Sequence, residues 1–305
     1  MSATSIAANH RSTIGVFDSG FGGLTVLREL LPLVSGAHCV YLGDTARLPY
    51  GSKSRETIIR YAISSARYLQ KRGAQLLVVA CNTATALALD ELRDALPIPV
   101  VGVVEPGAQA AAQACSEFKT RNPDTAPGEV LVVATQATVG AQAYTRACAK
   151  LGLRATEKAC PLLVPLVEEG WVADEAAAVA NANDAARASV TAQVLRIYLS
   201  EALNAAPASR TLLLGCTHYP LLRPQIERTL AELGRPLHII DSARATAQAV
   251  ARVLQEEGIT HPASINTTDA TCEFFATDSV EKFERLGSRF LGRPVAGVQL
   301  VDLGG

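Results

Sequence analysis

The amino-acid sequence predicts an α/β protein made of two similar domains with mainly parallel sheets. Short apolar runs rich in valine, isoleucine and leucine alternate with longer, alanine-rich amphipathic stretches, which is the order expected of parallel strands covered by helices. A strand–cysteine–helix pattern also occurs twice. The chain has 305 residues, of which 49% are hydrophobic, so it is long enough to bury two cores of ordinary size.

The first third of the chain supplies four predicted strands and the helices between them. The strands are expected at residues 14–18, 39–44, 76–80 and 99–104. Amphipathic patterns predict helices from Leu24 onward, over 55–72 and over 84–95. Each strand is therefore followed by a helix, as in a parallel sheet.

The remainder of the chain continues the alternation. Further strands are expected at residues 130–134, 211–215 and 237–241, and an alanine-rich helix at 173–188. Proline and glycine cluster at residues 122–128 and 205–209, which predicts surface loops there.

The repeat suggests how the chain divides. Residues 76–95 followed by a strand match residues 211–233 followed by a strand. We expect one domain from residues 14–101 together with 233–305, and a second from 102–232, related by a pseudo-twofold axis. Residues 1–13 lack the basic segment and apolar run of a secretory signal, and are expected to be a disordered extension.

Composition argues against several classes of partner. Lysine and arginine number 28 against 29 acidic residues, so no basic field is available for direct binding of nucleic acid. No apolar run approaches the roughly 20 residues that span a bilayer, so no membrane association is expected. The seven cysteines include no C-x-x-C pair, which favours a reducing, cytoplasmic setting over a disulfide framework or a zinc site.

Two cysteines stand between a strand and a predicted helix: Cys81 in A-C-N-T-A-T and Cys216 in G-C-T-H-Y-P. Free N–H groups at a helix amino terminus favour a thiolate and lower a thiol pKa that is otherwise about 8.5. Either residue alone could be a small buried side chain in a tight turn. Because open α/β sheets bind ligands at the carboxyl ends of their strands, two matching positions predict two thiols facing one cleft between the domains.

Polar neighbours extend this candidate site. Asn82 and Thr83 follow Cys81, and Thr217 and His218 follow Cys216. Such residues serve as helix N-caps, but the same positions can bind a carboxylate. An anionic ligand is therefore expected in the cleft.

Two further segments lie where strands end. F-D-S-G-F-G-G brings Asp18 and Ser19 to the end of the first strand, with glycines that would let a ligand approach the backbone. The loop at residues 42–54 offers backbone and hydroxyl groups, or is only a surface turn. Neither segment contains a dinucleotide or P-loop fingerprint, and neither metal-ligand spacing nor a lysine in a strand-end setting supports a metal or pyridoxal cofactor.

Taken together, F-D-S-G-F-G-G, L-G-D-T-A-R-L-P-Y-G, A-C-N-T-A-T, C-P-L-L-V-P-L-V-E-E-G and G-C-T-H-Y-P-L-L resemble the glutamate racemases. The resemblance extends from about Ile14 to about Leu291. It implies a cofactor-independent exchange of the α-proton of D- or L-glutamate between two opposed cysteines, supplying D-glutamate for bacterial peptidoglycan. It also implies a homodimer.

The same resemblance implies individual roles. Cys81 would act on D-glutamate and Cys216 on L-glutamate, with Asp18 and His218 assisting the thiols and Glu168 supporting His218. Substrate-binding positions would be Asp18, Ser19, Pro49, Tyr50, Gly51, Asn82, Thr83, Thr135, Thr138, Thr217 and His218.

Inversion of a stereocentre removes a proton from one face of the α-carbon and delivers one to the opposite face, which explains a need for two thiols. Donors placed where carboxylate charge grows must lower the barrier. The alternatives are an aspartate or hydantoin racemase, an arylmalonate decarboxylase, which needs only one proton donor, or a non-catalytic inhibitor of DNA gyrase, a role for which the charge balance gives no sign.

Overall fold

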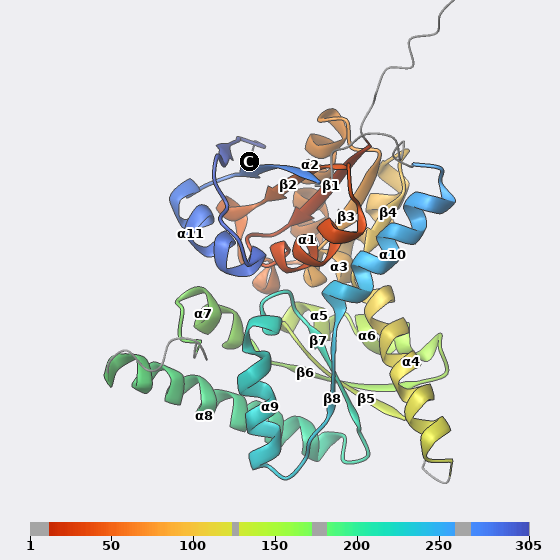
Figure 1. The fold of residues 1–305 in the computed structure, drawn as a ribbon, viewed down its shortest axis with the longest axis vertical. Coiled ribbons are helices and arrows are strands. Elements are labelled where there is room, and N and C mark those ends of the chain that lie inside the picture. The colour runs from red at the N-terminus through yellow and green to blue at the C-terminus, as the bar shows by residue number, and fades with distance from the viewer. Residues whose placement is uncertain (1–11, 124–127, 173–181, 260–269, 305) are drawn as a thin grey trace, which may run out of the picture.

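The computed structural model describes residues 12–123, 128–172, 182–259 and 270–304. The chain forms two α/β halves, each built on one parallel sheet (Figure 1). This confirms the fold class predicted from the alternation of apolar runs and amphipathic stretches. Among the described residues, no helix is both long and apolar enough to cross a bilayer.

The first sheet has the strand order β10-β9-β2-β1-β3-β4, with every neighbouring pair parallel. Its strands are β1 (Thr13–Asp18), β2 (His38–Gly43), β3 (Leu76–Val79), β4 (Val100–Gly102), β9 (Thr271–Ala276) and β10 (Gln299–Leu300). Alternate residues of a strand face opposite sides. Val16 accordingly packs in the apolar cluster with α1 (Leu24–Leu30), α10 (Ser242–Glu256) and α11 (Val280–Leu291). Phe17 packs on the other face with α2 (Arg55–Lys71) and α3 (Asn82–Ala95).

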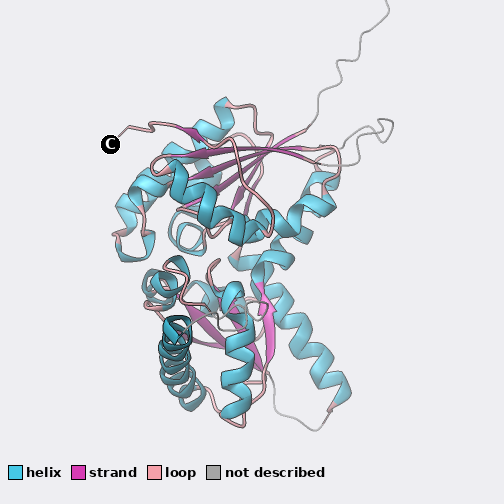
Figure 2. Cartoon of the chain, turned by 60° about the vertical axis from the view of Figure 1, so that its left-hand side comes forward, coloured by secondary structure: helices cyan, strands magenta, loops and turns pink. Residues whose placement is uncertain are grey.

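The second sheet has the order β6-β5-β7-β8 and is also parallel. Its strands are β5 (Glu129–Ala134), β6 (Arg154–Ala159), β7 (Thr211–Gly215) and β8 (His238–Asp241). One face packs against α4 (Val104–Arg121), α5 (Gln136–Gly140) and α6 (Ala143–Ala149). The other lies toward α7 (Leu163–Glu168), α8 (Ala182–Ala205) and α9 (Arg223–Glu232). Figure 2 shows helices on both sides of the two sheets.

The two halves share one plan. The order β2-β1-β3-β4 in the first sheet corresponds to β6-β5-β7-β8 in the second, which bears out the repeat seen in the sequence. In such doubly wound sheets the ligand crevice lies where the chain reverses direction across the sheet, here between β1 and β3 and between β5 and β7. Cys81 and Cys216 follow β3 and β7, so both lie beside these crevices.

Several sequence expectations need correction. The run at 99–104 is split, because β4 ends at Gly102 and α4 begins at Val104. β6 was missed because its sequence R-A-T-E-K-A is polar and only partly buried, as suits an edge strand.

The expected domain boundary also changes. β8 pairs with β7, and Ile240 packs in a core of the second half. The return to the first half therefore follows Asp241, rather than beginning near residue 233.

Some expectations fall outside the described residues. These are most of the amino-terminal extension, at residues 1–11, and part of each segment predicted at 122–128 and 173–188. The described part of the alanine-rich helix belongs to α8.

The chain crosses between the halves at two neighbouring places, from β4 into α4 and from β8 into α10 (Figure 1). α4 and α10 pack against each other, and α10 also packs against α1. The contact is close at Gly107, where an added Cβ would lie 3.2 Å from Ser242 Cβ. Both crossings therefore lie on the same side of the molecule.

Candidate active site

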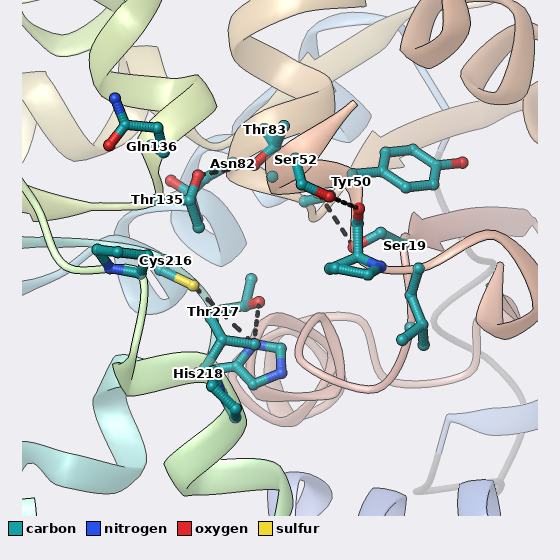
Figure 3. A pocket seen from close by; sticks show the side chains of 18 of the residues that line it. Ser19, Tyr50, Ser52, Asn82, Thr83, Thr135, Gln136, Cys216, Thr217 and His218 are labelled. Carbon is teal, nitrogen blue, oxygen red and sulfur yellow. Dashed lines mark hydrogen bonds between the residues drawn. The ribbon is translucent and has the colours of Figure 1, made fainter. Parts of the chain in front are cut away.

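A cavity of about 450 Å³ lies between the two halves, with walls from both (Figure 3). All the site residues predicted from the sequence line it except Asp18 and Thr138, which are buried behind the wall. The lining residues are Ser19, Gly20, Leu48, Pro49, Tyr50, Gly51, Ser52, Cys81, Asn82, Thr83, Thr135, Gln136, Pro161, Val164, Pro165, Glu168, Cys216, Thr217 and His218.

Cys81 is the N-cap residue of α3. Its Sγ accepts a hydrogen bond from the Ala84 backbone N–H at 3.4 Å, and its thiol donates to Ser19 Oγ at 3.5 Å. Burial raises the pKa of Cys81, and the nearby Asp18 carboxylate raises it further, to about 12. The prediction that the helix terminus gives Cys81 a lowered pKa is therefore wrong, because the effect of desolvation is larger than that of the helix terminus. Cys81 is a neutral thiol at pH 7.

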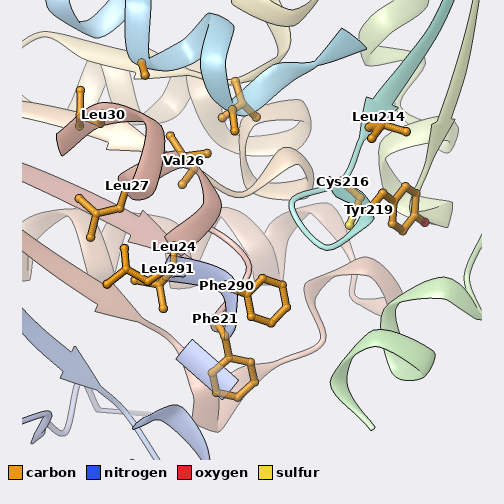
Figure 4. Close-up of a cluster of buried hydrophobic side chains, with 14 of the residues drawn as sticks. Phe21, Leu24, Val26, Leu27, Leu30, Leu214, Cys216, Tyr219, Phe290 and Leu291 are labelled. Atoms are coloured by element: carbon orange, nitrogen blue, oxygen red, sulfur yellow. The ribbon is translucent and has the colours of Figure 1, made fainter. Parts of the chain in front are cut away.

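Cys216 has a different environment. β7 is followed by a single 3₁₀ turn at Tyr219–Leu222, and α9 begins only at Arg223. The expectation that Cys216 directly precedes an α-helix is therefore wrong. Its Sγ instead lies 3.9 Å from His218 Nδ1, and apolar side chains including Leu214 and Tyr219 pack beside it (Figure 4).

His218 connects Cys216 to a carboxylate. Its Nε2 lies 3.1 Å from Glu168 Oε1, and its ring packs edge-on against Phe290. Burial lowers the pKa of His218, but the hydrogen bonds to Cys216 and Glu168 outweigh burial and raise the pKa to about 10. At pH 7 the imidazole is therefore protonated and can return a proton to Cys216.

Glu168 is held in place by His218 and Lys282. Burial raises the pKa of its carboxyl, but the hydrogen bond to His218 lowers it, and so does the charge of Lys282, whose Nζ lies 3.9 Å away. The net effect is a lowered pKa. The adjacent Glu169 is exposed. The geometry thus distinguishes the two neighbouring glutamates, which sequence patterning alone could not.

Asp18 lies at the end of β1 and is buried. Its Oδ2 accepts from the Gly20 backbone N–H at 2.8 Å, whereas Oδ1 has no hydrogen-bond partner within the described residues. Burial raises the pKa of Asp18, although the charge of His218 opposes the rise. Its ionised form acts on Cys81 through the electric field, because Ser19 rather than Asp18 makes the contact with the thiol.

Hydroxyl groups join the two halves across the cavity. Thr83 Oγ1, from α3, lies 2.9 Å from Thr135 Oγ1, the N-cap of α5, and Thr135 Oγ1 lies 3.0 Å from Thr138 Oγ1. These hydroxyls and the start of α5 form one polar wall, suited to a carboxylate.

Asn82 has a fixed amide. Tyr144 donates from its hydroxyl to Asn82 Oδ1 at 2.6 Å, while Asn82 Nδ2 is buried without a hydrogen-bond partner among the described residues. A buried unsatisfied donor beside a cavity is suited to binding an acceptor on a ligand.

Two sequence expectations about loops change. The Tyr50 hydroxyl donates to Asp44 Oδ2 and points away from the other labelled side chains (Figure 3), so it is not free to bind a ligand.

An added Cβ at Gly22 would lie 2.1 Å from Thr217 Oγ1 and 2.7 Å from His218 Nδ1. The absence of a side chain at Gly22 therefore allows the two halves to pack closely. It does not serve to let a ligand approach the backbone, as the sequence suggested.

Sequence reasoning missed several lining residues: Leu48, Gln136, Pro161, Val164 and Pro165. Val164 and Pro165 could have been found from spacing, because residues 164, 165 and 168 share one face of α7. Within the described parts of the chain, no group of three or more His, Cys, Asp or Glu residues could hold a metal ion. The cavity instead brings together two thiols, one protonated imidazole and a wall of neutral donors.

Comparisons with known proteins show the family of the chain. Residues 14–250 match the model of the Asp/Glu/hydantoin racemase family. The chain is 46% identical to a glutamate racemase of Koribacter versatilis, over 98% of this chain and 100% of the relative. It is similar to a glutamate racemase structure from Francisella tularensis in complex with D-glutamate, with TM-score 0.78, 29% identity and coverage of 96% and 98% of the two chains. A Thermus thermophilus glutamate racemase in complex with β-chloro-D-alanine has TM-score 0.75 and 39% identity, with coverage of 96% and 98%.

Proposed function

The chain belongs to the Asp/Glu/hydantoin racemase family and, within it, to the glutamate racemases, and from this we propose that it interconverts L- and D-glutamate by moving the α-proton between Cys81 and Cys216. The observation that carries the mechanism is that these cysteines follow the corresponding strands β3 and β7 and line one cavity. Thiols placed on opposite walls can act on opposite faces of one α-carbon.

In the direction from D- to L-glutamate, we assign the nearby Asp18 carboxylate, whose pKa burial raises, as the acceptor of the Cys81 proton. The resulting Cys81 thiolate removes the α-proton of the substrate. Its high pKa makes this thiolate a strong base. The Cys216 thiol then donates a proton to the opposite face, and His218 returns a proton to Cys216 across 3.9 Å. In the reverse direction Cys216 is the base and Cys81 the acid.

The polar wall stabilises the charge that grows on the α-carboxylate in the transition state. We assign this role to Thr83, Thr135 and the unpaired amide of Asn82, with Ser19 and Thr217 completing the contacts to the substrate. Thr138 supports Thr135 from behind. Pro49, Tyr50 and Gly51 line the remaining side.

The test is proton NMR in deuterated water with D-glutamate, L-glutamate or either enantiomer of aspartate, and with no added cofactor. We expect loss of the α-proton signal and racemisation, measured by circular dichroism, with glutamate. Cys81→Ser and Cys216→Ser should each lower the rate by at least about 10²-fold, since each removes one acid–base group. Cys148→Ser, at a buried cysteine on α6, is the matched control.

Exchange with aspartate alone would move the substrate assignment to a related racemase. Exchange that persists in both single variants would overturn the two-thiol mechanism. Exchange with glutamate also supports a role in supplying D-glutamate for peptidoglycan, which we propose takes place in the cytoplasm.

We also propose that the protein is a homodimer. Val190 and Ile197 are exposed apolar residues seven positions apart on α8, so they lie on the same helical face. Light scattering with size-exclusion chromatography is expected to give a molar mass of two chains. For the Ile197→Glu variant we expect the molar mass of one chain.

A further inference from the structure

Two cysteines that the proposed reaction does not use lie side by side in the first half. Cys39 of β2 and Cys272 of β9 are direct partners in the register of the parallel sheet. Both are free, and both pack in the same apolar cluster. Neither lines the catalytic cavity.

The two thiols differ in their surroundings. Cys39 is fully buried, whereas Cys272 is partly exposed. Arg293, an exposed residue after α11, directs Nη2 at Cys272 Sγ at 3.8 Å. The hydrogen bond from Cys39, together with Arg293, gives Cys272 a lowered pKa despite its burial, while the same hydrogen bond and burial raise the pKa of Cys39. The pair therefore consists of an accessible thiol with thiolate character and a buried partner in contact with it, as in redox-reactive cysteines.

Neighbouring contacts hold this register. His38 Nδ1 lies 3.0 Å from Thr271 Oγ1, and His38 Nε2 lies 3.6 Å from Glu273 Oε1. Adjacent strands are about 4.7–4.9 Å apart, within the roughly 4.4–6.8 Å between Cα atoms that a disulfide spans. In the described chain, β10 pairs only with Phe275 and Ala276 of β9. On the side away from β2, the Cys272 end of β9 therefore has no strand partner among the described residues.

From this geometry we propose that Cys39 and Cys272 form a hydroperoxide-sensitive dithiol, with Cys272 as the attacking thiol and Cys39 as the resolving thiol. The Cys272 thiolate attacks an oxygen of hydrogen peroxide, the O–O bond breaks, and hydroxide leaves, giving a sulfenic acid. Cys39 then attacks the sulfenic sulfur, an S–S bond forms and water leaves. The net change is the oxidation of two thiols to one disulfide and the reduction of one hydrogen peroxide to two waters.

The test is treatment of the native protein with hydrogen peroxide, followed by alkylation of the remaining thiols and peptide mapping by mass spectrometry. We expect a cross-linked peptide containing Cys39 and Cys272, two hydrogen masses below the sum of its reduced parts and absent after dithiothreitol. The same peptide is expected in a Cys81→Ser, Cys216→Ser double variant, in which the catalytic thiols cannot compete. This makes the result independent of racemase activity.

Three variants test the roles of the pair. Cys272→Ser should abolish the cross-link, and Cys39→Ala should leave a Cys272 sulfenic acid that dimedone traps. Arg293→Gln keeps both thiols and changes only an exposed residue, and it should slow cross-linking. Cys148→Ser should change nothing. The proposal is overturned if Cys272 in the folded wild-type protein stays alkylatable, or proceeds to sulfinic acid while Cys39 remains a thiol.

Discussion

Cys81 and Cys216 follow corresponding strands but have different polar neighbours. Cys81 is desolvated, faces the field of Asp18 and has a pKa of about 12. Cys216 has a protonated imidazole as its neighbour, held by Glu168. In the proposed reaction, Cys81 would act as a strong base once ionised, whereas Cys216 would receive protons from His218. The two directions of the proposed reaction would then differ in the groups that assist them.

The raised pKa of His218 links its charge to the stability of the protein. The folded protein holds this proton up to a pKa of about 10, against 6.5 for an ordinary histidine. The stabilisation is therefore complete below about pH 6.5 and is lost as pH rises toward 10. We expect the difference in free energy of unfolding between wild type and His218→Gln to be largest at pH 6 and to shrink by pH 10.

Urea unfolding of both proteins at pH 6, 8 and 10 measures this difference, in which contributions common to both proteins cancel. His238→Gln, at an exposed position on β8, is the control. A difference that is constant across this range would show that His218 is not charged in the folded protein.

Tyr144 is expected to act as a positioning residue for Asn82. Tyr144→Phe removes the donor to Asn82 Oδ1 and leaves a buried acceptor unpaired, which costs about 1–3 kcal/mol of stability. Because the amide is then free to rotate, KM for glutamate should rise more than kcat falls. Steady-state kinetics with both enantiomers measure this split. Tyr68→Phe, on α2 and outside the cavity, should leave KM unchanged.

At the scale of single elements, the sequence predicted the strands that end at the site because they are continuous apolar runs. Leu76–Val79 and Thr211–Gly215 are buried throughout, so their apolar character is visible without knowledge of their neighbours. β6 is polar and lies at an edge, so the same criterion missed it.

Properties that depend on pairing between distant segments could not be predicted from local patterns. The pKa of Cys81 depends on Asp18, which arrives from another strand, and Tyr144 reaches Asn82 from the opposite half. The contact between Cys39 and Cys272 depends on β2 pairing with β9. These contacts can be identified only once the order of the strands in each sheet is known.

Gly22, in the turn between β1 and α1, lies where the two halves pack closely against each other. Gly22→Ala would place a methyl carbon against Thr217 and His218, and overpacking of this kind costs about 1–3 kcal/mol. We expect a large loss of kcat, because both displaced residues line the cavity, with little change in far-UV circular dichroism. Gly140→Ala on α5 is the matched control, since an added Cβ there meets nothing within 4 Å. Equal activity in the two variants would contradict the assignment of Gly22 as a spacer.

At the scale of the whole molecule, a ligand in the cavity contacts both halves and should stabilise them together. With D-glutamate at 100 times its Kd, we expect the free energy of unfolding to rise by about 2.7 kcal/mol. Urea unfolding of the Cys81→Ser, Cys216→Ser variant measures binding without turnover. D-Glutamine, which lacks the second carboxylate, is the control ligand, and the same increase with it would argue against recognition of both carboxylates.

The neighbouring crossings at α4 and α10 have a mechanical consequence. Both covalent connections lie on one side and are packed together, which is the arrangement a hinge requires, while the far side is joined by contacts such as Lys282 with Glu168. Rotation about such a hinge would separate the two thiols and open a passage for glutamate without unfolding either sheet. Closure would return both sulfurs to opposite faces of the α-carbon, so admission of the substrate and alignment of the two proton-transfer groups would be the same movement.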